Sequence, residues 1–180
     1  MKKVTVHNKQ FVLMKEEREI VAAIKKTADK INHDLRDSHP LFVSILNGAF
    51  MFTAELMKHI DIPDAEISFV KLSSYSAMQS TGKVSSLIGL NQSIKGRNVV
   101  ILEDMVDSGL SMHYLVEQLQ KEGAESISIS ALFVKPDAMK YPVDIKYPVM
   151  ELGLDFVVGY GLDYDGHGRQ YPDLYILDKQ

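Results

Sequence analysis

The stretch VVILEDMVDSGLS, residues 99–111, decides the fold of this 180-residue chain. An apolar strand runs into the adjacent carboxylates Glu103 and Asp104, and a third carboxylate, Asp107, follows shortly after them. A turn of small residues then opens a helix that is predicted to stop at Gly123. In open parallel sheets, ligands bind beyond the carboxyl ends of the strands, so we expect this strand end to carry the functional site.

The turn 107–111 has the composition of an anion-binding loop. It can direct successive backbone N–H groups and two serine hydroxyls at one anion, with the positive dipole end of the helix behind them. It is not a Walker loop, because the spaced glycine and the Gly-Lys pair are missing. Carboxylates beside a phosphate loop imply a sugar or a divalent cation, so Glu103 and Asp104 are expected to hold ribose hydroxyls or a hydrated Mg²⁺. The alternative is that Asp107 or Ser108 only caps the helix and that the acidic pair Glu103-Asp104 is solvated.

The rest of the apolar pattern predicts strands that alternate with helices. Helices are expected over 15–35, 49–59 and 111–122, and strands over 41–46, 66–72, 84–90, 98–102, 126–134, 156–161 and 173–177. Several of these strands are apolar on both faces, which indicates an α/β fold with a mostly parallel central sheet flanked by helices. The chain shows no internal repeat, low-complexity tract or linker, so residues 1–180 are expected to form a single domain.

The composition excludes several classes of protein. Hydrophobic residues make up 46% and charged residues 24%, which is typical of globular proteins. Cysteine is absent, which rules out disulfides and thiolate metal sites and fits the cytoplasm, the expected location. The N-terminal residues lack the pattern of a signal peptide and the apolar runs are too short to span a membrane. With a net charge of -4, neither nucleic acid nor a membrane is an expected partner.

The stretch 99–111 closely resembles the phosphoribosyl-pyrophosphate signature of the type I phosphoribosyltransferases. Nearly the whole chain resembles the bacterial hypoxanthine-guanine phosphoribosyltransferases in the order and spacing of its motifs. The resemblance implies the type I fold with a small purine-binding hood. It also implies an Mg²⁺-dependent purine salvage enzyme that joins hypoxanthine or guanine, with xanthine as a further candidate, to phosphoribosyl pyrophosphate. The products would be IMP or GMP and pyrophosphate, and the enzyme would be a homodimer or homotetramer.

The same resemblance assigns roles along the stretch 99–111. Asp107 would be the catalytic base that takes a proton from purine N7 while N9 attacks the sugar. Glu103 and Asp104, with the more distant Asp163, would be the groups that approach Mg²⁺. The loop 107–111 would hold the 5′-phosphate. The substrate-binding residues of the stretch would be Glu103, Asp104, Met105, Val106, Ser108, Gly109, Leu110 and Ser111.

Two further segments resemble loops of the family. Leu46-Asn47-Gly48 would bind pyrophosphate through main-chain groups, and the peptide bond entering this loop is often cis in relatives. Many relatives carry a basic residue where this chain has Asn47. Ser74-Tyr75 opens a long polar segment, 73–83, that resembles a mobile lid; the alternative is a surface loop without a function. A lid would protect an oxocarbenium-like species from water.

The purine would be held by residues near the C-terminus. Lys135 would donate to the purine O6, Phe156 would stack on the base, and the backbone of Val157 would read its Watson–Crick edge. Asp163 would reach the metal on pyrophosphate, and Arg169 the pyrophosphate itself. Without the resemblance, strand packing would account for Phe156 and Val157, and solvated charges for the other three.

Two other classes of protein compete with this interpretation. A regulatory protein on the same fold, similar to the pyrimidine-operon attenuators that bind RNA, would need a basic face that this composition does not indicate. A signalling receiver domain also has an apolar strand that ends in an acidic pair, but places it after the first strand. Here the pair lies beyond residue 100, and the Asp-Ser-Gly-Leu-Ser turn after it would have no purpose in a receiver.

Overall fold

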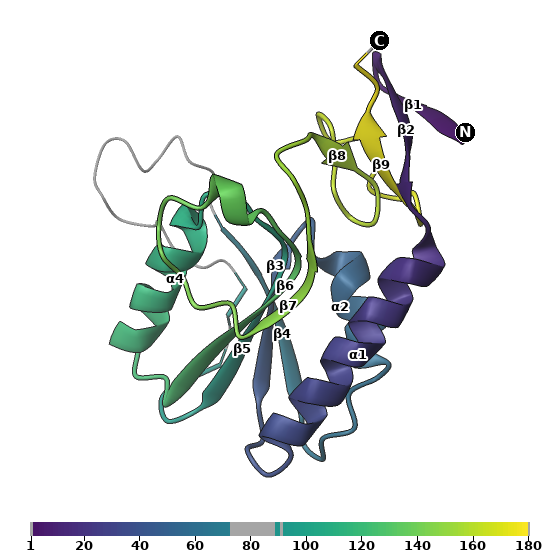
Figure 1. Ribbon diagram of the computed structural model, residues 1–180. Helices are drawn as coiled ribbons and strands as arrows, with labels where there is room; N and C mark the ends of the chain where they lie inside the picture. Colours follow the sequence, from purple (N-terminus) through teal and green to yellow (C-terminus); the bar gives the residue numbers. More distant parts are fainter. Residues whose placement is uncertain (1, 73–88, 91, 180) are drawn as a thin grey trace.

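The computed structural model describes residues 2–72, 89–90 and 92–179, which form two separate sheets (Figure 1). The larger one, called the main sheet below, has five parallel strands in the order β4-β3-β5-β6-β7. These are β3 (Leu41–Leu46), β4 (Glu66–Lys71), β5 (Asn98–Val106), β6 (Ser126–Val134) and β7 (Tyr147–Glu151). The three described α-helices are α1 (Glu17–Leu35), α2 (Phe50–Met57) and α4 (Leu110–Lys121), and a short 3₁₀ turn, η2 (Pro136–Ala138), follows β6.

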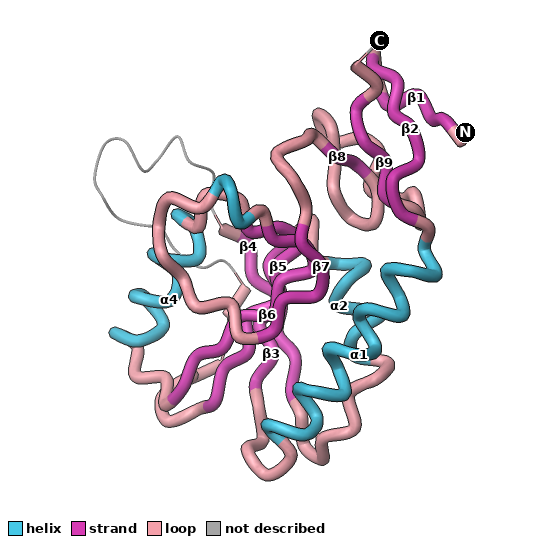
Figure 2. The backbone as a smooth tube through the Cα atoms, viewed as in Figure 1, coloured by secondary structure: helices cyan, strands magenta, loops and turns pink. Residues whose placement is uncertain are grey.

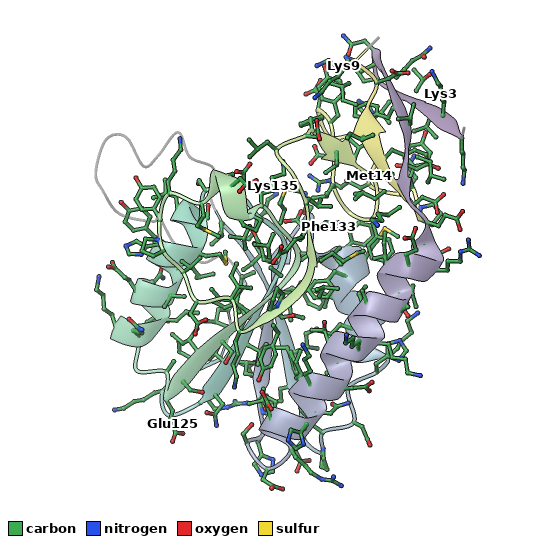
Figure 3. All side chains as sticks on the ribbon, in the orientation of Figure 1. Lys3, Lys9, Met14, Glu125, Phe133 and Lys135 are labelled. Atoms are coloured by element: carbon green, nitrogen blue, oxygen red, sulfur yellow. The ribbon has the colours of Figure 1, made fainter. Side chains whose placement is uncertain are left out.

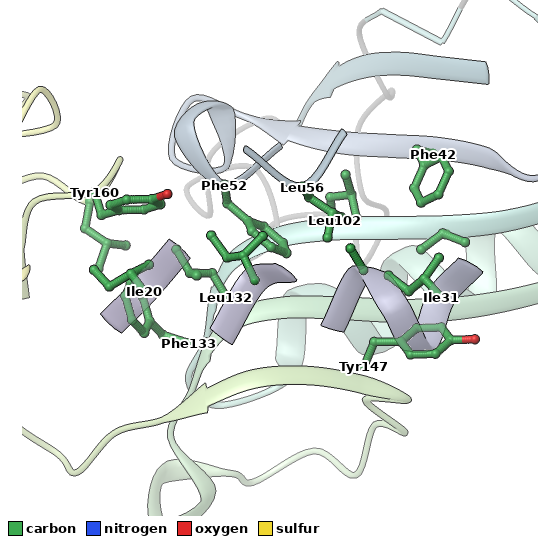
Figure 4. Packing of buried hydrophobic residues seen from close by; sticks show 14 of the residues in the cluster. Ile20, Ile31, Phe42, Phe52, Leu56, Leu102, Leu132, Phe133, Tyr147 and Tyr160 are labelled. Carbon is green, nitrogen blue, oxygen red and sulfur yellow. The ribbon is translucent and has the colours of Figure 1, made fainter. Parts of the chain in front are cut away.

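Helices cover both faces of the main sheet because its central strands are apolar on both sides. In β5, Val100 and Leu102 pack in the cluster that contains α1 and α2, whereas Val99 and Ile101 pack in the cluster that contains α4. Figure 4 shows the first cluster, in which Leu102 lies among side chains of α1 and α2. This alternation follows from the two-residue repeat of a strand and confirms the predicted class of fold.

The second sheet, called the hood sheet below, has four antiparallel strands in the order β1-β2-β9-β8. They are β1 (Lys3–Val6), β2 (Lys9–Lys15), β8 (Val157–Val158) and β9 (Leu174–Leu177), so both ends of the chain meet there. It has its own small core, formed by Val6, Phe11, Val158 and Tyr175. Figure 2 shows that the hood sheet stands apart from the main sheet and is joined to it where β2 runs into α1.

Several boundaries differ from the sequence-based expectations. The strand expected to end at residue 102 continues to Val106, because its ladder with β6 continues through Glu103, Met105 and Val106. The strand expected over 156–161 ends at Val158, because the next three residues have positive φ and form a turn. The strands β1, β2 and β7 are not among the expected ones; β7 is an edge strand that contains Pro148, which weakens the strand signal.

The segment 73–83 and most of the expected strand 84–90 lie outside the described residues. The lid predicted to begin at Ser74-Tyr75 therefore lies outside the described residues and stays a prediction. Within the described ranges, no helix combines the length and apolarity needed to cross a membrane.

Candidate active site

A cavity of about 200 Å³ lies where β5 ends and α4 begins. α4 starts directly after Gly109, whose φ of 81° lies in the left-handed region that glycine adopts without strain. The first N–H groups of a helix have no partner within the helix, so this end of the cavity presents backbone donors to an anion. The lining residues are Glu103, Met105, Val106, Asp107, Ser108, Gly109, Leu110, Ser111 and Met112.

The turn at this cavity is held from behind by residues 139–141. The Ser108 carbonyl accepts hydrogen bonds from the backbone N–H groups of Lys140 and Tyr141, both at 3.0 Å. A Cβ at Gly109 would lie 2.4 Å from the Tyr141 carbonyl oxygen, so no side chain fits there. The donors of the turn are thus fixed in direction before any ligand arrives, which is the preorganisation that anion binding needs.

Glu103 lines this cavity, and one of its carboxylate oxygens has no partner among the described residues. Its Oε2 is shielded from solvent and accepts no hydrogen bond within the described residues. Burial, and to a lesser degree the charge of Asp104, raise the pKa of the Glu103 carboxyl well above its ordinary value. A buried acceptor without a partner costs free energy. A cation or a hydroxyl that reached this oxygen would remove that cost.

Asp104 follows Glu103 in the strand, so its side chain points to the other face of the main sheet. It lies against the loop after β3: a Cβ on Gly48 would fall 1.4 Å from Asp104 Oδ2. The peptide bond Leu46–Asn47 that enters this loop is cis, as the resemblance implied. Burial raises the pKa of the Asp104 carboxyl to about 6, although the N–H of Met105 donates to it at 2.8 Å.

Two more predicted residues, Asp163 and Arg169, lie near Asp104, and Arg169 is bonded to the turn 159–163. Arg169 Nη2 forms an ion pair with Asp163 Oδ1 at 2.6 Å, and its Nη1 donates to the Gly161 carbonyl at 2.8 Å. The charges of both residues act on the pKa of Asp104, the arginine lowering it and the aspartate raising it. Gly161, at φ 98°, would place a Cβ only 2.1 Å from the Gly48 carbonyl oxygen. The turn therefore docks on the loop after β3, beside Asp104.

Lys135 is buried at the end of β6, although a lone lysine at a strand end is usually solvated. Only 7% of it is exposed, and its Nζ donates to the Asp155 carbonyl at 2.9 Å. Figure 3 shows it in the region between the main sheet and the hood sheet. The residue after Asp155, Phe156, is 43% exposed, and its ring meets Tyr164 edge to face at 5.8 Å. The ammonium is thus bonded to the residue that directly precedes a partly exposed aromatic side chain.

The predicted residues form three groups. The first group lines the cavity at the turn 107–111, which is called the phosphate-loop cavity below. The second group comprises Asp104, Gly48, Asp163 and Arg169. The third group comprises Lys135, Phe156 and the buried Val157. The phosphate-loop cavity itself is lined by none of the residues of the second and third groups. Sequence reasoning missed Gly161, Asp155 and Tyr164, which join these groups. Only the Gly-Tyr-Gly spacing at 159–161 carried a signal, because glycines in a strand pattern suggest a turn or a close approach.

The donor chemistry fits Mg²⁺ bound together with a substrate. Among residues 2–72, 89–90 and 92–179, no group of three His, Cys, Asp or Glu side chains could hold a metal ion. Mg²⁺ usually keeps several waters and is held by one or two carboxylates plus phosphate oxygens. Glu103 and Asp104, on opposite faces of β5, and Asp163 supply oxygen donors only, and Glu103 has an unpartnered oxygen.

A parallel main sheet, a phosphate loop between β5 and α4, and a hood sheet built from both chain ends define the type I phosphoribosyltransferase fold. The family model described as phosphoribosyl transferase domain matches residues 14–165. The hypoxanthine-guanine phosphoribosyltransferase of Bacillus subtilis is 38% identical over 172 residues, 95% of this chain and 94% of that protein. That of Dictyostelium discoideum is 35% identical over 168 residues, 91% and 93% of the two chains.

Solved structures agree with these matches. The hypoxanthine phosphoribosyltransferase of Trypanosoma cruzi, a lysine-to-arginine mutant in a ternary complex with substrates, superposes with a TM-score of 0.86 at 31% identity. The match covers 93% of this chain and 95% of that one. The chain belongs to the hypoxanthine-guanine phosphoribosyltransferase family. It is therefore a phosphoribosyltransferase, an enzyme that transfers a glycosyl group.

The raised pKa of Asp104 predicts how stability depends on pH. The pKa is about 6 in the folded state against 3.8 ordinarily, so the folded state binds this proton more tightly than the unfolded state. The resulting stabilisation is complete below pH 4 and is lost as the pH rises through 6, a loss of about 3 kcal/mol. Asp104→Asn should therefore unfold at a higher urea concentration than the wild type at pH 7.5, with the difference shrinking toward pH 4. An asparagine variant that is no more stable at pH 7.5 would contradict the assignment.

Proposed function

We propose that this protein transfers the 5-phosphoribosyl group of phosphoribosyl pyrophosphate to hypoxanthine or guanine, giving IMP or GMP and pyrophosphate in purine salvage. One observation carries the proposal. The buried ammonium of Lys135 donates to the carbonyl of Asp155, the residue before the exposed Phe156, and β6, which Lys135 follows, lies next to the strand that carries the turn 107–111. A flat base with an oxo group and a sugar phosphate are the two ligands that such neighbours would recognise together.

The phosphate loop would hold the 5′-phosphate and orient the sugar. Its backbone donors are fixed by the hydrogen bonds behind Ser108, so the sugar would be positioned without further ordering of the loop. The carboxylates Glu103 and Asp104 would accept from the ribose hydroxyls. A divalent Mg²⁺ ion held by Glu103, Asp104 or Asp163 would neutralise negative charge on the pyrophosphate. Arg169 and the backbone of 46–48 would contact the same group.

Asp107 would act as the general base. It is exposed and lines the phosphate-loop cavity, which supports this role. It would take a proton from purine N7 while N9 forms the new bond to the sugar. The proton has to leave because the attacking nitrogen becomes positively charged in that step.

Lys135 would select 6-oxopurines. Its ammonium donates to the Asp155 carbonyl and has two further N–H groups, one of which can donate to a purine O6. Adenine has an amino group at this position, so its N–H groups would face the N–H groups of the Lys135 ammonium. Both sets of donors would then be buried without an acceptor. Sites that reject a substrate in this way discriminate strongly.

Ser74 and Tyr75 remain proposed as the start of a lid that shields the reacting sugar from water. We also propose a cytoplasmic enzyme that forms a homodimer or homotetramer. Exposed apolar side chains support the association: Phe50 at the start of α2, and Ile67 and Phe69 on one face of the edge strand β4, are 42%, 38% and 44% exposed. Burying such side chains between copies would be favourable. Sedimentation of the protein as a monomer at micromolar concentration would rule the association out.

The activity can be tested directly. Purified protein with Mg²⁺ and phosphoribosyl pyrophosphate should convert hypoxanthine and guanine to nucleotides, followed by ultraviolet absorbance, and should leave adenine unchanged. Chelation of the metal should stop the reaction. In Lys135→Met, which keeps the length of the side chain, the KM for hypoxanthine should rise by at least about tenfold, as for a lost charge-assisted hydrogen bond. The KM for phosphoribosyl pyrophosphate should stay within about twofold, since the mutation leaves the phosphate loop intact.

Asp107→Asn tests the proposed base separately from binding. Turnover should fall by about 10²–10⁴-fold, the usual contribution of a positioned general base. Binding of phosphoribosyl pyrophosphate, measured by calorimetry, should barely change, because the backbone donors of the loop remain. Wild-type turnover in this variant would remove the role assigned to Asp107. Ser108→Ala is the matched comparison in the same loop, and it should weaken sugar-phosphate binding instead.

A further inference from the structure

Asp173 is a buried carboxylate that the reaction described above does not use. Only 7% of it is exposed, and it precedes β9 directly. Its Oδ1 accepts from the backbone N–H of Glu17, the first residue of α1, at 2.9 Å. Its Oδ2 accepts from Lys2 Nζ at 2.6 Å and from the Tyr175 hydroxyl at 3.1 Å. One side chain thus ties three segments that are distant in the sequence.

These contacts satisfy the carboxylate and favour its charged form. Hydrogen bonds from Lys2, Glu17 and Tyr175 hold the pKa of Asp173 below its ordinary value. The N–H of Glu17 belongs to the first turn of a 19-residue helix, where a negative charge is stabilised by the helix dipole. Charge-assisted hydrogen bonds of this kind are among the stronger ones in proteins. Asp173 is therefore a firm attachment between the hood sheet and the helix that covers the main sheet.

The backbone of Asp173 reaches the segment that would bind the base. Its carbonyl oxygen lies against Gly159, where an added Cβ would approach to 2.1 Å. Gly159 directly follows β8, the strand that contains Val157. The turn after it is closed by a hydrogen bond from the Tyr160 N–H to the Tyr171 carbonyl at 2.8 Å. A shift of Asp173 would therefore move β8 and this turn together.

The same turn ends on the main sheet. The Gly161 N–H donates to the Arg169 carbonyl at 3.0 Å, and Gly161 packs on the carbonyl of Gly48. A continuous series of contacts thus runs from α1 through Asp173 and Gly159 to the loop after β3. Both ends of this series belong to the helices and loops of the main sheet. Between them, Val157, Tyr160 and Leu162 of the base-binding segment pack in the core cluster shared with α1 and α2, so a shift of the segment would be felt there as well.

We propose that Asp173, with Lys2 as its partner, is a positioning residue that sets the place of the base-binding segment 156–163 over the sugar-phosphate site. The inference rests on the proposed function for its kinetic meaning, but its structural part stands by itself. Asp173 touches no substrate; it acts through Gly159 and β8. Its loss should affect the base more than the sugar phosphate, because the phosphate loop belongs to the main sheet.

The hood sheet offers a matched control pair. Lys3 Nζ contacts Asp178 Oδ2 at 2.7 Å, and the side chains of Asp173 and Asp178 are 10% and 13% exposed. The two pairs thus have the same residue types, nearly the same length and similarly buried carboxylates. The control pair joins β1 to the residue after β9, at the end of the hood sheet.

Asp173→Asn and Asp178→Asn should therefore be compared at one temperature well below unfolding. Asp173→Asn should raise the KM for hypoxanthine by about tenfold, the size expected for a lost charge-assisted hydrogen bond. The factor by which the KM for phosphoribosyl pyrophosphate changes should be less than half of the factor for hypoxanthine. Asp178→Asn should leave both within about twofold. Lys2→Met should reproduce part of the effect of Asp173→Asn and add little to it in the double variant, as expected for partners in one interaction.

Amide hydrogen exchange gives a readout that does not need activity. In Asp173→Asn, without ligands, the N–H groups of Tyr160 and Gly161 should exchange faster than in Asp178→Asn, while those of β3 and β5 stay protected. Equal exchange in the two variants, or equal changes in the two KM values, would overturn the proposal. If the wild type fails to use hypoxanthine but the exchange difference is found, the proposed function is wrong and the anchor still stands.

Discussion

Two neighbouring carboxylates, Glu103 and Asp104, lie partly buried at the end of β5, and the rest of the site is arranged around them. Because successive side chains of a strand point to opposite faces, one carboxylate enters the phosphate-loop cavity and the other meets the loop after β3. Burial raises the pKa of both, so the folded protein holds them at a cost in stability. Such a cost in stability is typical of functional sites, where a bound ligand supplies the positive charge or the hydrogen-bond donors that the carboxylates lack.

The close approach of Asp104 constrains its neighbours in turn. No side chain fits at Gly48, and no side chain fits at Gly161, which lies on the Gly48 carbonyl. The loop after β3 therefore meets the turn at Gly161 backbone to backbone and meets β5 through the side chain of Asp104, and Arg169 with Asp163 completes the group. Side chains are excluded at these two glycines, which would leave main-chain groups and charges free to surround a small anion if the proposed pyrophosphate site is correct. The chemistry of the site thus depends as much on its glycines as on its charged residues.

The parts of the fold that the sequence predicts well are those set by local patterns. The helix 15–35, the strands 41–46 and 126–134, and the acidic turn 103–111 each follow from periodicity or composition within a short window. What was missed depends on partners elsewhere. β2 exists because β1 and β9 lie on either side of it, and β5 extends past residue 102 because β6 continues beside it. Phe156 and Val157 were placed at the base by resemblance, because a strand pattern cannot show that one ring remains exposed.

The division of the molecule into two sheets explains how one site can treat two substrates differently. The phosphate loop follows β5 of the main sheet and is braced by residues 139–141, whereas Phe156 and Val157 belong to the hood region. Several contacts nevertheless join this region to the main sheet, and Val157 packs in the core cluster shared with α1 and α2. One of these contacts is made by Lys135, which is buried in the main sheet yet donates to a carbonyl of the hood segment. A purine that accepts from the same ammonium would bridge the two parts. The base would then add to the attachment that Asp173 already provides, and its binding energy would be used to orient it over the sugar.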